Sequence, residues 1–258
     1  MSNSNEEQII LKWKFNPPDF FEALYTSEEE DFKIEIDNGS INAKMSSFFY
    51  ESQPDVRMEI YEKINDIFLG AQVVNFKPFS ITNSTMHRFH SKGQKGTTIF
   101  LEPLVLNVNL SEFVDIKITD KNGNIVGNAK SDRIKSIKNI TKLTIKFGRT
   151  DFIAASILKS FNNAVNDPAN ELVHLYENLE SHRRRFGNDK KIREDLDVSN
   201  NSIRDLHRLA NDNCIKQGRH RGQNPSNLRS ANSSEIRKAR DIARKLIISY
   251  LEYLEGAT

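Results

Sequence analysis

The residues best suited to chemistry lie in one stretch of the chain, residues 207–222. These sixteen residues hold two histidines, the only cysteine and four basic side chains. An imidazole moves protons near neutral pH, and a guanidinium binds phosphate through a planar fork of donors. The stretch therefore predicts a site that binds phosphate or acts on a phosphodiester.

His220 is the candidate catalytic group of this stretch. Arg219 and Arg221 flank it, so the imidazole would transfer the proton while the guanidiniums stabilise the charge that develops on the phosphate. This arrangement is the hypothesis of a metal-independent nuclease. The alternative is an exposed basic loop that performs no catalysis. Cys214 is a weaker candidate nucleophile, because neither a positioned base nor an oxyanion site can be recognised around it.

Phosphate binding is the favoured function of the surrounding segment. Residues 182–245 carry 17 Lys and Arg against 8 Asp and Glu. Contacts to phosphate supply most of the sequence-independent affinity for nucleic acids. We therefore expect binding of RNA or another phosphate-bearing ligand, without a cofactor or a metal. A non-enzymatic component that pairs these cations with an acidic protein partner is the alternative. The expected contacts are Arg204, Arg208, Lys216, Arg219, Arg221 and Arg229.

Residues 191–209 also fit the spacing of a helix-turn-helix. A short helix would be followed by a turn and by a second helix over 201–209, which Ile203 would anchor. This spacing predicts DNA binding as a further alternative. Against it, Asp197 stands at the turn position usually given to glycine, and Asp205 places negative charge on the proposed recognition helix.

His87 and His90 are the other histidine pair with suggestive spacing. No Cys, Asp or Glu close in sequence completes a set of metal ligands around them. The polar, glycine-bearing segment 86–96 is therefore interpreted as the exposed end of a hairpin, and no metal site is predicted.

The composition is that of a globular protein. Of the 258 residues, 37% are hydrophobic, 16 residues are Phe, and 28% are charged. No apolar run approaches the roughly 20 residues that span a bilayer, and the polar start MSNSNEEQ lacks the pattern of a signal peptide. With Cys214 as the single cysteine, no intrachain disulfide is expected. These features favour a cytoplasmic bacterial protein without a membrane partner.

The composition changes near residue 150. Residues 1–150 contain 15 Lys and 4 Arg, whereas residues 151–258 contain 6 Lys and 12 Arg. The hydrophobic pattern changes at the same place, from alternation typical of strands to the spacing of three and four typical of helices. We therefore predict two domains, 1–150 and 151–258.

The first domain is expected to be an antiparallel sheet with one or two covering helices. Alternation over residues 9–15 indicates a strand with one buried face, and Asn38-Gly39 between alternating runs indicates a hairpin. A helix is expected from Val56 to Phe68, with Gly70 as its end. Further strands are expected over 71–81, 97–101, 104–110, 114–119 and 124–128, and a further helix over 131–147. The last two of these strands flank 121–123, which indicates a second hairpin turn.

The second domain is expected to be an all-α bundle. Its last helix has the clearest pattern, with Ser233 or Ser234 as its cap and Gly256 at its end. The predicted fold class is therefore α+β, an amino-terminal antiparallel-sheet domain followed by an all-α carboxy-terminal helical bundle. The earlier helices are expected over 151–165, from Pro168 to Phe186, and over 188–195 and 200–210.

The order of elements in residues 151–258 resembles HEPN domains, helical modules of bacterial defence and toxin systems that bind or cleave RNA. The resemblance rests on a polar, histidine-bearing connection ahead of a long last helix, and it implies an RNA ligand. The catalytic Arg-x4-6-His pattern of that family is absent, because Asn213, Cys214 and Ile215 stand where its Arg would precede His220. The full chain also resembles bacterial proteins without an established activity. A variant site would consist of Arg208, Asn211, Arg219 and His220.

Overall fold

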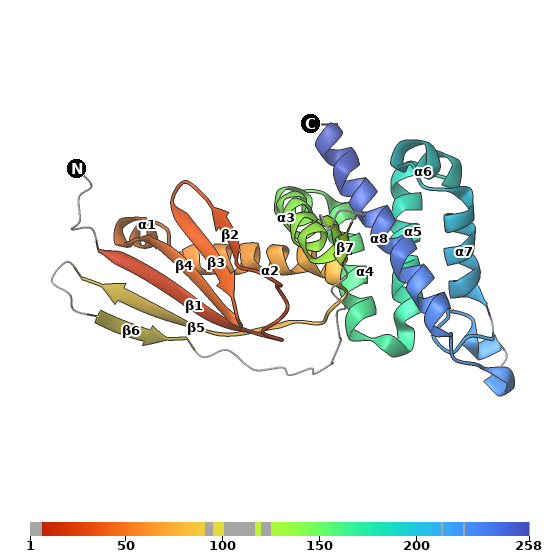
Figure 1. Cartoon of the computed structure of the whole chain (residues 1–258), viewed down its shortest axis with the longest axis horizontal. Helices are drawn as coiled ribbons and strands as arrows, with labels where there is room; N and C mark the ends of the chain where they lie inside the picture. The colour runs from red at the N-terminus through yellow and green to blue at the C-terminus, as the bar shows by residue number, and fades with distance from the viewer. Residues whose placement is uncertain are drawn as a thin grey trace. The chain divides into compact units, whose positions relative to one another are not determined.

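Figure 1 shows the computed structural model of the chain, in which an antiparallel sheet is followed by helices. The fold class is therefore α+β with a carboxy-terminal helical part, as the sequence predicts. The described residues are 7–90, 95–100, 117–119, 125–212, 214–223 and 225–257.

The chain divides into two compact units. The sheet unit comprises Met1–Asn65 and Lys77–Lys138, and the helical unit comprises Asp66–Phe76 and Asn139–Thr258. The change of composition predicts one boundary near residue 150. The compact helical unit instead begins at Asn139 and also takes in a short piece from the amino-terminal half.

The sheet unit is built on six antiparallel strands in the order β2-β3-β4-β1-β5-β6. β2, β3 and β4 pair as successive neighbours, as do β5 and β6, and β1 lies between β4 and β5 and pairs with both. The strands are β1 (Gln8–Asn16), β2 (Tyr25–Glu28), β3 (Phe32–Asp37), β4 (Ser40–Ser46), β5 (Ser80–Phe89) and β6 (Lys95–Ile99).

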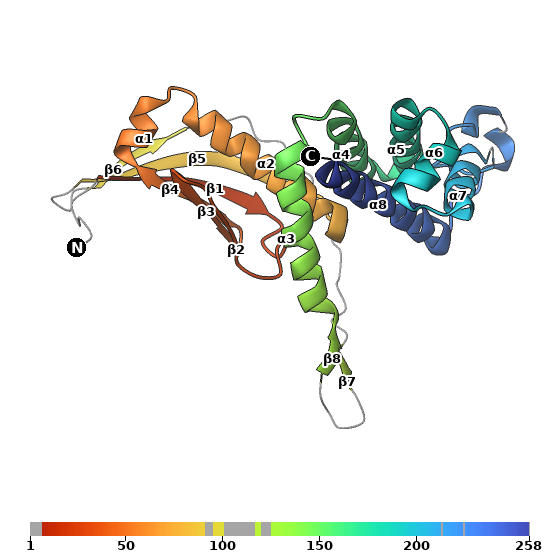
Figure 2. The same ribbon diagram turned by 90° about the horizontal axis from the view of Figure 1, so that it is seen from above.

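The alternation in β1 gives the sheet one buried face. Ile9, Leu11 and Trp13 are at most 1% exposed, whereas the residues between them are exposed or half-buried. The short helix α1 (Ser47–Ser52) and the start of α2 (Val56–Asn75) lie on the buried side (Figure 2). We call the opposite side, which carries the alternate residues, the open face.

Two hairpins follow the sequence signals. β3 and β4 are joined at Asn38 and Gly39, whose φ angles of 44° and 75° are those of the tight turn that Asn-Gly predicts. β7 (Lys117–Thr119) and β8 (Ile125–Asn128) also pair antiparallel. The expected turn at 121–123 and the expected strand over 104–110 lie outside the described residues.

The prediction of a strand over 71–81 is wrong in its first half. Helix α2 continues through Gly70 to Asn75, and β5 begins only at Ser80. A Cβ atom on Gly70 would lie 2.8 Å from the Cα of Thr141, so the glycine permits close packing of α2 on α3 (Ala129–Phe147). Gly70 is therefore a packing position, which a single sequence does not distinguish from a helix end.

The helical unit has one apolar core. The predicted helices form within a few residues of their expected ends, and their buried faces meet around side chains such as Phe161, Leu179 and Leu246. Together with the carboxy-terminal part of α3, the helices are α4 (Phe152–Asn166), α5 (Glu171–Phe186), α6 (Asp189–Leu196), α7 (Asn200–Asn211) and α8 (Ser233–Gly256).

Candidate nucleic-acid interface

The connection between α7 and α8 is folded back on the end of α7. Ile215 is fully buried and forms an isolated parallel bridge with Arg229, and the amide of Arg219 donates to the carbonyl of Ala210 at 2.7 Å. A Cβ on Gly218 would lie 3.0 Å from the same carbonyl oxygen. Part of this polar segment is thus buried structure that holds the connection in place.

Three of the six predicted phosphate contacts are engaged within the protein. Arg219 donates to Glu180 at 2.7 Å, and its guanidinium lies 4.9 Å from the ring centre of Tyr176. Arg221 donates to the backbone carbonyls of Ala169 and Lys216, at 3.3 and 3.2 Å. These contacts tie the connection to neighbouring elements of the unit.

Arg229 is the third of these engaged residues. It donates two hydrogen bonds of 2.8 Å to Glu235, and these bonds are the main reason why the pKa of Glu235 falls to about 2. Glu235 also accepts from the backbone amide of Asn232, whose side chain accepts from Glu235 in return. The cap of α8 is thus Asn232 in a capping box, and the prediction of Ser233 or Ser234 is wrong.

The other three predicted contacts point to solvent. Arg204, Arg208 and Lys216 are exposed, and none of them forms an ion pair within the part of the chain that the structure describes. Arg204 makes only a 3.3 Å hydrogen bond to Asn201. Arg204 and Arg208 lie one turn apart on α7 and both lower the pKa of Asp205, after the larger effect of its partner Lys238.

His220 has no carboxylate partner among the described residues. Its ring is half-buried, and Nδ1 lies 3.2 Å from the side-chain amide of Gln223. The guanidinium of Arg219, which the nuclease hypothesis requires near a substrate phosphate, is paired with Glu180. The catalytic role of His220 stays a prediction.

A groove between α7 and α8 gathers charged residues of α8 that are not among the contacts predicted from the sequence. Its volume is about 390 Å³, within the usual range of roughly 300–1,000 Å³ for ligand sites. On α8 the spacing 234, 237, 238, 241, 245 marks one side of a helix, which is the signal that could have identified it. The lining residues are Val198, Ser202, Ser234, Arg237, Lys238, Asp241, Ile242 and Lys245.

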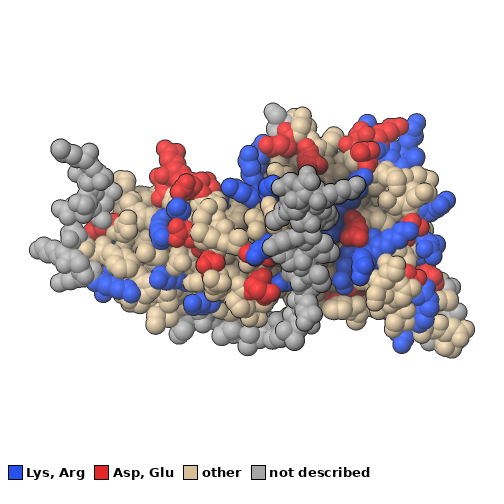
Figure 3. Space-filling view, viewed as in Figure 1, with Lys and Arg blue, Asp and Glu red and all other residues tan. Residues whose placement is uncertain are grey.

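The charge in this groove is positive and only partly compensated. Lys238 pairs with Asp205 at 2.6 Å, and Asp241 pairs with Arg244 at 3.0 Å. Arg237 and Lys245 are exposed and have no ion-pair partner within the described ranges. Basic side chains gather over α8 and beside α7 in Figure 3.

Two short helices and a turn form where the helix-turn-helix hypothesis places them, α6 before the turn and α7 after it. Asp197 is left-handed, with φ 49° and ψ 47°, the conformation for which glycine is commonly used. Leu196 and Val198 on either side are buried, and the side chain of Ser199 caps α7 by accepting from the amide of Ser202. The local structure is confirmed, whereas DNA binding stays a prediction.

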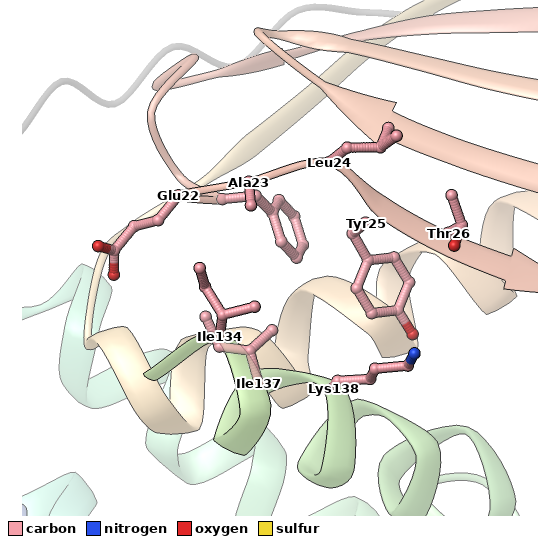
Figure 4. Close-up of a pocket in the computed structure, with 9 residues that line it drawn as sticks. Glu22, Ala23, Leu24, Tyr25, Thr26, Ile134, Ile137 and Lys138 are labelled. Carbon is pink, nitrogen blue, oxygen red and sulfur yellow. The ribbon is translucent and has the colours of Figure 1, made fainter. Parts of the chain in front are cut away.

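A second, much smaller pocket lies in the sheet unit. Its volume is about 70 Å³, and Phe21, Leu24, Ile134 and Ile137 give it an apolar lining (Figure 4). The pocket lies between helix α3 and the segment that leads into β2, and it is too small for a macromolecular ligand.

No protein-family model matches the chain, and neither a curated protein nor a solved structure shows a significant match. The resemblance to HEPN domains therefore stays a prediction. None of the helices within the described residues is long and apolar enough to cross a membrane. The described residues also contain no group of three or more His, Cys, Asp or Glu side chains arranged to hold a metal ion.

Proposed function

We propose that the helical unit binds RNA through the groove between α7 and α8. The observation that supports this proposal is the pair of cations in the groove, Arg237 and Lys245, which no carboxylate among the described residues neutralises. Arg204 and Arg208 add exposed positive charge on α7, the helix on the other side of the groove from α8. Among the residues predicted from the sequence, these two take part in the proposed site.

The chemistry of the groove suits a phosphate backbone. Arginine and lysine supply charge, and the hydroxyl of Ser234 adds a donor of the kind that contacts phosphate oxygens. Asp241 forms its ion pair with Arg244, at 3.0 Å, and not with Arg237 or Lys245. The proposal includes a cytosolic location and, as the HEPN resemblance implies, an accessory role in a bacterial defence or toxin system.

The test is the affinity of the full chain for a fluorescently labelled RNA of 20 nucleotides, measured by anisotropy over a series of salt concentrations. Each phosphate contact adds roughly 0.7–0.9 to the slope of log affinity against log salt. The double variant Arg237→Gln with Lys245→Gln should reduce that slope by about 1.4–1.8, because it removes two contacts.

The matched control is Lys130→Gln with Lys135→Gln on α3. Both lysines are exposed and lie in the sheet unit, and the control makes the same change of net charge. The control should retain the affinity and the slope of the unchanged chain. Equal losses in both double variants, or binding that does not respond to salt, would contradict the proposal.

DNA binding through α6 and α7 is the second candidate function, and the left-handed turn at Asp197 favours it. In that case the outward residues Asn201, Arg204 and Arg208 of α7 would enter a major groove. Duplex DNA of 20 base pairs would then bind more tightly than the RNA, and Arg204→Gln would reduce its affinity more than Lys245→Gln.

A further inference from the structure

The open face of the sheet carries a cationic half. Directly paired residues on antiparallel strands point to the same side, so the register places side chains of β1, β5 and β6 together. Ile10 of β1 pairs with His87 of β5, which pairs in turn with Thr97 of β6. On this side the same three strands present Lys12, Lys14, Thr85, His87, Phe89, Lys95, Thr97 and Ile99.

No acidic residue occurs in the sequences of β1, β5 and β6. Lys12, Lys14 and Lys95 also form no ion pair with any other described residue. The pKa of His87 on the same face is lowered, first by partial burial and then by the positive charges of Lys95 and Lys12.

The other half of the same face differs. Its lysines are neutralised, because Lys33 pairs with Glu28 at 3.0 Å and Lys44 pairs with Glu35 at 2.7 Å. Positive charge is therefore concentrated on β1, β5 and β6, and that half complements a polyanion.

The cationic half also exposes apolar side chains. Phe89 is 37% exposed and Ile99 is 65% exposed. The ammonium of Lys95 lies 5.7 Å from the ring centre of Phe89. An aromatic ring beside a cation allows a base to stack while a neighbouring phosphate is neutralised.

We propose that this half of the open face binds single-stranded RNA, with Lys12, Lys14 and Lys95 on phosphates and Phe89 against a base. The site is distinct from the groove of the helical unit, because every residue in it belongs to the sheet unit. A single strand is the favoured form, since its unstacked bases are free to reach the ring, whereas those of a duplex are stacked on one another.

The test uses the full chain and a fluorescently labelled uridine octamer. Binding is measured in the unchanged sequence and in the background of Arg237→Gln with Lys245→Gln, which separates the two surfaces. In that background, Lys12→Gln with Lys95→Gln should lower the salt slope by about 1.4, the value for two contacts to a single strand. The control Lys130→Gln with Lys135→Gln should leave it unchanged.

Phe89→Leu separates stacking from charge. It should weaken octamer binding about fivefold or more, because a stacked base contributes roughly 1–3 kcal/mol. Binding of inorganic polyphosphate, which has no bases, should stay the same. Circular dichroism checks that each variant keeps the fold.

Three results would overturn the proposal. The first is an unchanged affinity for the octamer when Lys12→Gln and Lys95→Gln are added to the Arg237→Gln, Lys245→Gln background. The second is tighter binding to an RNA duplex of eight base pairs than to the single strand. The third is binding to vesicles of anionic phospholipid without binding to RNA, which would assign the face to a membrane surface.

Discussion

Among single residues, His182 is the buried titratable group with the clearest consequence. It is fully buried in the helical unit, its Nδ1 lies 2.6 Å from the carbonyl of Asn178, and the ring of Tyr250 meets it edge to face at 5.3 Å. Burial lowers its pKa from 6.5 to about 4, because the charged imidazolium cannot be solvated there.

This burial makes stability depend on pH. The neutral imidazole is the native form, so its contribution is complete above pH 6.5, and it declines as the pH falls from 6.5 towards 4, where the unfolded chain binds a proton that the native state excludes. We expect the free energy of unfolding to decrease across this window, by up to about 3 kcal/mol in total.

Urea unfolding between pH 7.5 and 5 measures this effect, and His182→Gln is the control. The variant is expected to be less stable at every pH, since it alters the core, but its unfolding free energy should lose the slope between pH 6.5 and 5. An unchanged slope in His182→Gln would assign the dependence to other groups.

Among the elements, helices α2 and α3 pack closely against each other at Gly70. Replacing a glycine inside a helix with alanine normally stabilises by about 1 kcal/mol. At Gly70 the new Cβ would lie 2.8 Å from the backbone of Thr141, which cannot move aside like a flexible side chain.

Gly70→Ala should therefore be destabilising, by about 1–3 kcal/mol, as is usual for overpacking. Thermal and urea unfolding of the full chain measure it. Gly256→Ala is the matched control, because the end of α8 has nothing within 4 Å of the added methyl group. A Gly70→Ala variant as stable as the control would show that α2 and α3 separate at little cost.

Gly70 also shows why part of the fold follows from the sequence and part does not. Local signals predict the Asn38-Gly39 turn and the helices of the second unit, because periodicity and turn residues act over a few positions. Gly70 is different: its role depends on Thr141, which is far away in the sequence. The packing role of Gly70 is thus set by tertiary structure, which the local pattern does not encode.

The candidate site divides in the same way. Local charge density identifies the region between 182 and 245, and Arg204 and Arg208 are exposed as expected. Which cations are available depends on partners elsewhere in the chain. Glu180 engages Arg219 across 39 residues, and no spacing rule predicts that pairing.

At the scale of the whole molecule, the two proposed surfaces lie in separate compact units. Each carries cations that no described carboxylate neutralises, Arg237 and Lys245 in one and Lys12, Lys14 and Lys95 in the other. We expect each surface to bind short RNA through its own cations, because the residues of one surface belong to a different compact unit from those of the other.

We therefore expect two uridine octamers to bind each chain at saturation in low salt. The groove variant (Arg237→Gln, Lys245→Gln) and the sheet variant (Lys12→Gln, Lys95→Gln) should each keep one site at full affinity and bind weakly at the other, and the combined variant should bind weakly at both. Native mass spectrometry and isothermal titration calorimetry count the bound strands. If the unchanged chain binds a single octamer, and only one of the two double variants weakens that binding, RNA binding belongs to one unit alone. Only the cations of that unit would then contact the phosphates.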